Sequence, residues 1–76
     1  MKYSADDRQF LRRLGLQIRR YRKKIGWSQE EFAFESNLDR SYIGGIERGE
    51  RNISVLNLNK ITDALKINIS KLFTPH

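Results

Sequence analysis

The chain has 76 residues, and this length allows one small domain with a modest core. It has no cysteine, and its single histidine is the terminal His76, so we expect neither a disulfide framework nor a metal site built from Cys and His. Fifteen Lys and Arg against nine Asp and Glu give a formal net charge of +6. This excess favours a polyanionic partner, chiefly nucleic acid, over the alternatives of an anionic membrane, an acidic protein or a merely solvated basic surface.

No apolar run approaches the roughly 20 residues that span a bilayer, and the N-terminus lacks the apolar core of a secretion signal. We therefore expect a soluble cytoplasmic protein, associated with the nucleoid of a prokaryote or encoded by a phage. No cofactor is expected. The segment from Arg8 to Lys24 contains many basic residues and no acidic residue. Membrane binding by this segment is disfavoured, because its apolar stripe is needed for the core.

A long first helix is predicted to end near Gly26. Its apolar residues recur at intervals of three and four, which is typical of an amphipathic helix, and they are Phe10, Leu14, Ile18, Tyr21 and Ile25. Its other faces are basic, through Arg12, Arg13, Arg19, Arg20, Lys23 and Lys24. This basic side is either a solvated surface or a source of salt-dependent affinity for a polyanion.

Two short helices are predicted next, from Gln29 to about Ser36 and from Arg40 to about Arg48. Ser28 and Glu31 have the spacing of a capping box, which marks the start of the first of the two. Three further signals mark the other helix ends. Asn37 tolerates the left-handed backbone that ends the first short helix, Asp39 can cap the start of the second, and Gly49 can end the second. The residues expected to face the core are Phe32, Ala33, Ser36, Ile43 and Ile46.

A fourth helix is predicted after Ser54, a plausible N-cap, and a last short turn after Asn68. The fourth helix would bury one face made of Val55, Leu58, Ile61 and Leu65. The turn would contain Ile69, Leu72 and Phe73 and end at Pro75. No segment alternates apolar and polar residues over a length that would build a sheet. The expected fold is all-α, a single domain over residues 1–76 with five helices.

The two short helices and their three-residue connection predict a helix-turn-helix. Ala33 is expected to be small because the second helix of the pair crosses over it. That second helix would then be exposed enough to enter a DNA major groove.

Residues 14–73 resemble the Cro/CI-type helix-turn-helix family, also called the XRE family. The resemblance is carried by "LGLQIRRYRKKIGWSQEEFA", "LDRSYIGGIERG" and "ISVLNLNKITDALKINISKLF". The run "SNLDRSYIGGIERGERN" is similar to the controller proteins of restriction-modification systems. This subgroup implies a lambda-repressor-like domain that binds palindromic operators as a homodimer. It further implies activation of its own and the endonuclease gene at low concentration, with RNA polymerase as a partner, and repression at higher occupancy.

The sequence departs from the family pattern at two places. Asn37 stands where many relatives have glycine, which is a mild change because asparagine also adopts the left-handed conformation. Residues 1–11 precede the usual first helix, and they either lengthen it or fold against a partner subunit.

The DNA-binding residues follow from position in the motif. Arg40 lies in the first turn of the recognition helix, where it can bind guanine, although pairing with a phosphate or with Asp39 is the alternative. Ser41 can bond to base or phosphate, and Tyr42 either meets the sugar-phosphate edge or packs on the helix. Resemblance to the family implies a phosphate contact for Gln29, and the alternative is that Gln29 only begins its helix. It also implies DNA-backbone or minor-groove contacts for Arg48, Arg51 and Asn52, and the alternative there is a solvated basic loop.

Gly44 and Gly45 each cost a helix about 1 kcal/mol relative to alanine. A close approach of another backbone to the helix is therefore expected to compensate for this cost. At least one of them should lie toward the groove, with Gly44 as the candidate, unless both are simply tolerated. The family pattern assigns Arg22 and Glu47 to an ion pair between the first and third helices.

A dimer is expected because operators for this fold usually have two half-sites. Some of the surplus apolar residues near the C-terminus are candidates for the interface, and the alternative is that they only complete the core. These residues are Ile67, Ile69, Leu72 and Phe73.

Two other functional classes are weaker. No catalytic site is expected, because the only acidic cluster, Glu30, Glu31 and Glu35, has no histidine, cysteine or metal-ligand spacing beside it. A protein-binding module of the antitoxin type would need a capturing extension, for which no segment is left over. A phage-type or other small XRE repressor has the same chemistry as a controller protein, and only genomic neighbours would separate the two.

Overall fold

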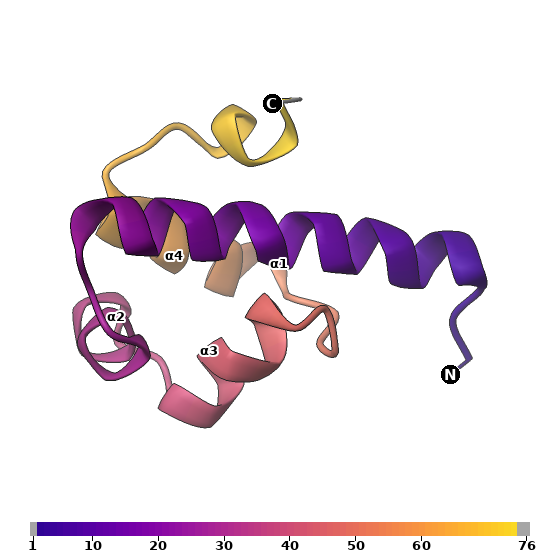
Figure 1. Ribbon diagram of the computed structural model, residues 1–76, viewed down its shortest axis with the longest axis horizontal. Helices are drawn as coiled ribbons and strands as arrows, with labels where there is room; N and C mark the ends of the chain where they lie inside the picture. The colour runs from indigo at the N-terminus through magenta and orange to yellow at the C-terminus, as the bar shows by residue number, and fades with distance from the viewer. Residues whose placement is uncertain (1, 75–76) are drawn as a thin grey trace.

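The computed structural model describes residues 2–74, and within this range the chain forms four α-helices and one 3-10 helix, without a β-strand. The elements are α1 (Ala5–Ile25), α2 (Gln29–Ser36), α3 (Arg40–Glu47), α4 (Val55–Leu65) and η1 (Ile69–Phe73). In Figure 1, α1 crosses the molecule with α2 and α3 below it, η1 above it and α4 behind it. The all-α prediction is confirmed, although the fifth helix is a 3-10 helix of five residues.

The first helix begins earlier than the family pattern requires. Ser4 and Asp7 form a reciprocal capping box, in which each backbone N–H donates to the other residue's side chain at 3.0 Å. Residues 5–11 therefore lengthen α1, which is the first of the two alternatives for this extension. The helix ends at Gly26, whose φ of 96° only glycine adopts without strain.

The local signals place the other helix ends as predicted. Ser28 caps α2 in a capping box with Glu31, and Asn37 ends that helix in the left-handed conformation, with φ 58°. Asp39 and Ser54 accept hydrogen bonds from the first turns of α3 and α4. Pro75, the predicted end of the last turn, lies outside the described residues.

One hydrophobic core joins all five elements. Its buried members are Leu14, Ile18, Phe32, Ala33, Ile43, Ile46, Leu58, Ile61, Leu65 and Leu72. Phe32 is completely buried and stacks on Trp27 from the connection before α2, with ring centroids 6.0 Å apart. This packing fixes α2 and α3 against each other and so sets the geometry of the helix-turn-helix.

Three residues assigned to apolar faces are not buried. Phe10 and Ile25 are 51% and 45% exposed because α1 is longer than the core, which its middle turns cover. Val55 is 81% exposed. It is the first residue of α4, and helical side chains lean toward the N-terminus, so Val55 points past the end of the core.

Candidate nucleic-acid interface

The corner between α2 and α3 is held by hydrogen bonds that are local in the chain. Leu38 donates its backbone N–H to the carbonyl of Ala33 at 2.9 Å, which closes the end of α2. Ala33 is 6% exposed and lies in the core between the two helices, as its small size predicted. The first turn of α3 is consequently presented at a fixed angle on the outside of the molecule (Figure 1).

The start of α3 has solvent-exposed polar groups. The Asp39 carboxylate accepts hydrogen bonds from the hydroxyl and the backbone N–H of Ser41, and these bonds hold the pKa of Asp39 below its usual range. Arg40 pairs with Glu30 at 3.8 Å, and not with Asp39. Both side chains of that pair are more than half exposed, so the contact is weak and Arg40 is available to another acceptor.

A buried ion pair connects three helices behind this surface. Arg22 donates from Nε and Nη2 to the two carboxylate oxygens of Glu47 at 2.7 and 2.9 Å, and from Nη1 to the carbonyl of Trp27 at 2.8 Å. Gln29 adds a bond from Nε2 to Glu47 at 3.1 Å. Arg22 and Glu47 thus pair as expected, and the side chain of Gln29 belongs to the same network.

Gly44 lies beside Gln29 and beneath Arg48. A Cβ atom at this position would be 3.1 Å from Nη1 of Arg48 and 3.5 Å from Oε1 of Gln29. Arg48 also forms an exposed ion pair with Glu50 at 3.0 Å, which raises the pKa of Arg48 and lowers that of Glu50. The missing side chain therefore gives space to Arg48 at the end of α3.

Tyr42 is half-buried and belongs to a second cluster. Its hydroxyl accepts a hydrogen bond from Nδ2 of Asn57 at 3.0 Å, and the guanidinium carbon of Arg51 lies 5.8 Å from the centre of its ring. The alkyl chain of Arg51 runs past Gly45, where a Cβ atom would be 3.0 Å from Cγ. Asn52, the residue after Arg51 in the chain, is exposed. Sequence reasoning missed Asn57, because no local signal links a residue of α4 to the ring of Tyr42.

Gly15 in α1 also has a role that sequence reasoning missed. A Cβ atom at Gly15 would overlap the carbonyl oxygen of Ile46 and lie 2.8 Å from that of Glu47, so α1 crosses α3 with backbone against backbone. At Gly49, whose φ is 75°, a Cβ atom would lie 2.7 Å from Cα of Arg12. A glycine inside the helical pattern of α1 was the signal available for Gly15.

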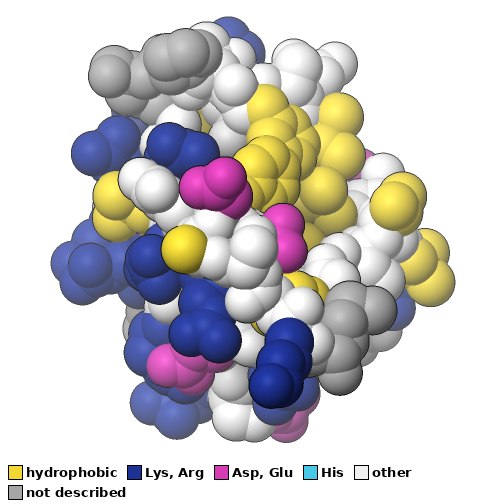
Figure 2. Space-filling model, turned by 90° about the vertical axis from the view of Figure 1, so that its right-hand side faces the viewer, with side chains coloured by type: hydrophobic (Ala, Val, Ile, Leu, Met, Phe, Trp, Pro, Cys, Tyr) yellow, Lys and Arg dark blue, Asp and Glu magenta, His cyan; other side chains and the backbone are white. Residues whose placement is uncertain are grey.

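The end of the molecule where α1 begins is divided by side-chain type. Figure 2 shows hydrophobic side chains gathered on its upper and right-hand parts, while Lys and Arg lie mainly on its left and lower parts. On this face the basic side chains are thus concentrated in one part of the surface, as expected where a polyanion binds.

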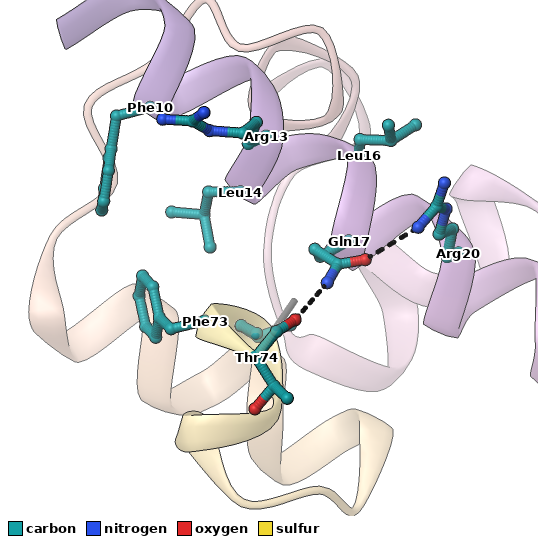
Figure 3. Close-up of a pocket in the computed structure, with 9 residues that line it drawn as sticks. Phe10, Arg13, Leu14, Leu16, Gln17, Arg20, Phe73 and Thr74 are labelled. Carbon is teal, nitrogen blue, oxygen red and sulfur yellow. Dashed lines mark hydrogen bonds between the residues drawn. The ribbon is translucent and has the colours of Figure 1, made fainter. Parts of the chain in front are cut away.

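A groove lies between α1 and η1, on the side of α1 away from α3. It encloses about 560 Å³ and is lined by Phe10, Arg13, Leu14, Leu16, Gln17, Arg20, Leu72, Phe73 and Thr74. Phe10 and Phe73 stack with centroids 6.0 Å apart, and Gln17 donates from Nε2 to the carbonyl of Thr74 at 3.0 Å (Figure 3). These contacts attach η1 to α1.

The four apolar residues proposed for a dimer interface differ in exposure. Leu72 is 2% exposed and belongs to the core, so it is not available to a partner, and Ile67 is half-buried against the core. Ile69 and Phe73 are 42% and 50% exposed. Among residues 2–74 no group of His, Cys, Asp or Glu is arranged to hold a metal ion, and no helix is long and apolar enough to cross a membrane.

Residues 18–72 match a family model described as helix-turn-helix, HTH_3. The control protein C.MunI from a Mycoplasma species is 46% identical over 63 residues, which are 82% of this chain and 85% of that protein. The crystal structure of the restriction-modification controller protein C.AhdI from Aeromonas hydrophila matches with a TM-score of 0.84 at 48% identity, over 86% of this chain and 98% of that one. The structure of C.Esp1396I bound to a 19 base pair DNA duplex matches with a TM-score of 0.76 at 38% identity, over 83% and 84% of the two chains.

Proposed function

The chain belongs to the HTH_3 helix-turn-helix family, and we propose that it is a sequence-specific DNA-binding transcriptional regulator that acts as the controller of a restriction-modification system. The observation that carries the proposal is the exposed first turn of α3, which follows the hydrogen-bonded corner after α2, together with Arg48 and Arg51 just beyond the end of the same helix. The controller assignment is supported by similarity to C.MunI and C.AhdI. The protein would activate transcription at low concentration, in contact with RNA polymerase, and repress it at higher occupancy in the cytoplasm, at the nucleoid.

Base recognition is assigned to the start of α3. Arg40 has only a loose partner in Glu30, and it can exchange that carboxylate for O6 and N7 of a guanine in the major groove. The hydroxyl of Ser41 donates to Asp39, so its oxygen remains an acceptor for a base or for a bridging water. These two residues would supply the direct readout.

Contacts to the DNA backbone are assigned to the ends of the two helices. Gln29 opens α2, where free backbone N–H groups and the helix dipole attract a phosphate. Its side chain is engaged with Glu47, so the backbone N–H is the better candidate for that contact. Arg48, Arg51 and Asn52 follow α3 and would reach the phosphates or the minor groove.

A homodimer fits the apolar end of the molecule. Ile69 and Phe73 are exposed, and the lengthened α1 adds Phe10 beside Phe73. Since η1 lies on the side of α1 opposite α3 (Figure 1), pairing there would leave α3 free for DNA. Two copies related by a two-fold axis would read a palindrome, one half-site each.

The function is tested by selecting binding sites from random duplex DNA at near-physiological salt and titrating the enriched sequences by fluorescence anisotropy. An enriched inverted repeat is expected, and its presence upstream of neighbouring restriction-modification genes would identify a controller. Arg40→Ala should relax sequence preference, whereas Arg20→Ala, on the groove side of α1, should leave it unchanged. Binding without enrichment that disappears as salt is added would contradict the proposal, because only charge would then be recognised.

The dimer is tested by sedimentation equilibrium. Ile69→Asp should shift the protein toward the monomer, while Phe34→Asp, at an 81% exposed position on α2, serves as the matched control. Equal association of both variants and the wild type would exclude the η1 surface as the interface.

A further inference from the structure

The half-buried Asn57 side chain on α4 has no assigned role, and it makes a side-chain hydrogen bond to the recognition helix. Its Nδ2 donates to the hydroxyl oxygen of Tyr42 at 3.0 Å. Its backbone N–H separately donates to Ser54 and caps α4, so the side chain is not needed to start the helix. We propose that Asn57 is a positioning residue, which holds Tyr42 so that the tyrosine ring directs Arg51 into the DNA groove.

Asn57 acts first on the orientation of Tyr42. A tyrosine whose hydroxyl accepts a hydrogen bond from a neighbouring helix is fixed in one rotamer. Because the oxygen of Tyr42 acts as the acceptor in this bond, its own proton remains free to donate to a phosphate. The bond from Asn57 therefore fixes the ring and leaves the hydroxyl proton available to DNA.

Tyr42 in turn acts on the position of Arg51. This residue lies in the connection between α3 and α4, where a long side chain otherwise has many rotamers. Its guanidinium group is over the Tyr42 ring at 5.8 Å, within the range of a cation–π contact, and its alkyl chain passes against Gly45. Tyr42 thus contacts the guanidinium of Arg51 and Gly45 contacts its alkyl chain, and together they hold the side chain in one position in the free protein.

Holding a side chain in its bound position lowers the entropy cost of binding. Loss of the Asn57 side chain should therefore lower operator affinity and specificity more than it lowers the stability of the fold. This inference rests on the proposed function, in which Arg51 contacts DNA. Asn59 provides a matched control, since it is an exposed asparagine of the same helix whose side chain bonds only within α4, to Asp63 at 3.4 Å.

The first measurement uses the free protein and needs no DNA. Ring-current shifts of the Arg51 side-chain protons are recorded by NMR for the wild type, Asn57→Ala and Asn59→Ala. The shifts should collapse toward random-coil values in Asn57→Ala and persist in Asn59→Ala, while the thermal unfolding curves stay similar. Unchanged Arg51 shifts in Asn57→Ala would overturn the proposal.

The second measurement compares affinity for the selected operator with affinity for a scrambled duplex of the same length. Asn57→Ala should lose about three- to tenfold in operator affinity, the effect of one hydrogen bond, and little on the scrambled duplex. In combination with Tyr42→Phe, the double variant should bind no more weakly than Tyr42→Phe alone. Losses that add, or an Asn57→Ala variant that binds like Asn59→Ala, would overturn the positioning role.

The two measurements separate the possible failures. If the wild type selects no operator, the proposed function fails, and the role of Asn57 in DNA binding fails with it, whatever the NMR shifts show. If the wild type binds its operator and only the Asn57→Ala effects are missing, the proposed function stands and the positioning role alone is overturned.

Discussion

The two sides of α3 use glycine in opposite ways. On the inner side, at the α1–α3 junction (Gly15, Arg22, Ile46 and Glu47), Gly15 brings two backbones together, and a Cβ there would overlap a carbonyl oxygen. On the outer face of α3, Gly44 and Gly45 are buried beneath the side chains of Arg48 and Arg51, and a Cβ at either would meet only arginine and glutamine side chains, which can move. Glycine at the junction is therefore required by the fold, whereas glycine on the outer face makes room for side chains assigned to DNA.

The largest expected effect breaks the junction at its ion pair. Arg22→Ala leaves the buried carboxylate of Glu47 without a cation and should lower the free energy of unfolding by about 3 to 5 kcal/mol. Urea unfolding measures this loss. Arg22→Met combined with Glu47→Leu removes both charges and should recover most of it. A double variant as unstable as Arg22→Ala would contradict this account.

The next effect tests the helix crossing directly. Gly15→Ala should cost about 3 kcal/mol, because α1 and α3 must separate to admit the methyl group. The matched control is Gly44→Ala, which adds the same methyl group to the outer face of α3. Comparable thermal midpoints for the two variants would show that the junction tolerates a side chain after all.

The outer face should respond with the opposite sign in stability. Gly44→Ala and Gly45→Ala each remove the helix cost of a glycine, so each should gain up to about 1 kcal/mol in the free energy of unfolding. Operator affinity should fall, most for Gly45→Ala, because the methyl group displaces Arg51 from Tyr42. If both variants are more stable and bind DNA like the wild type, the close-approach hypothesis is wrong.

The smallest effect is the acid dependence of the α3 cap. The pKa of Asp39 in the folded chain lies below its ordinary value of 3.8, chiefly because the Ser41 side chain donates to its carboxylate. The unfolded chain thus binds more protons in this window, and stability falls as the pH drops from about 3.8 through the lower folded value. Ser41→Ala should make that decline shallower in unfolding curves recorded across the window, and an unchanged slope would contradict the assignment.

The sequence predicted the features that depend on neighbouring residues. The capping box of Ser28 and Glu31, the left-handed Asn37 and the Asp39 cap each need only a few residues of chain, and all three are present. The family resemblance read from the same segment is confirmed by the match over residues 18–72. Burial at the helix ends was predicted less well, since periodicity does not reveal where a core stops, as Phe10 and Val55 illustrate.

The glycines show how far one signal extends. A glycine inside a helical pattern indicates a close approach, but not what approaches. Gly15 gives the same signal as Gly44 and Gly45, but the contact there is backbone against backbone. Whether a glycine lies against a side chain that can move or against backbone that cannot is known only once the helices are packed together.

The sequence by itself determined the helices, most of their ends and the helix-turn-helix, because capping and periodicity act within a few residues of one another. The start of α1 at Ala5 was left open. Only the tertiary structure decided which side chains meet across elements. Tyr42, Arg51 and Asn57 lie on α3, in the following connection and on α4, and they come together because the buried residues of α3 and α4 share one core. Such contacts depend on the relative placement of whole helices, which is set by packing and not by any local pattern.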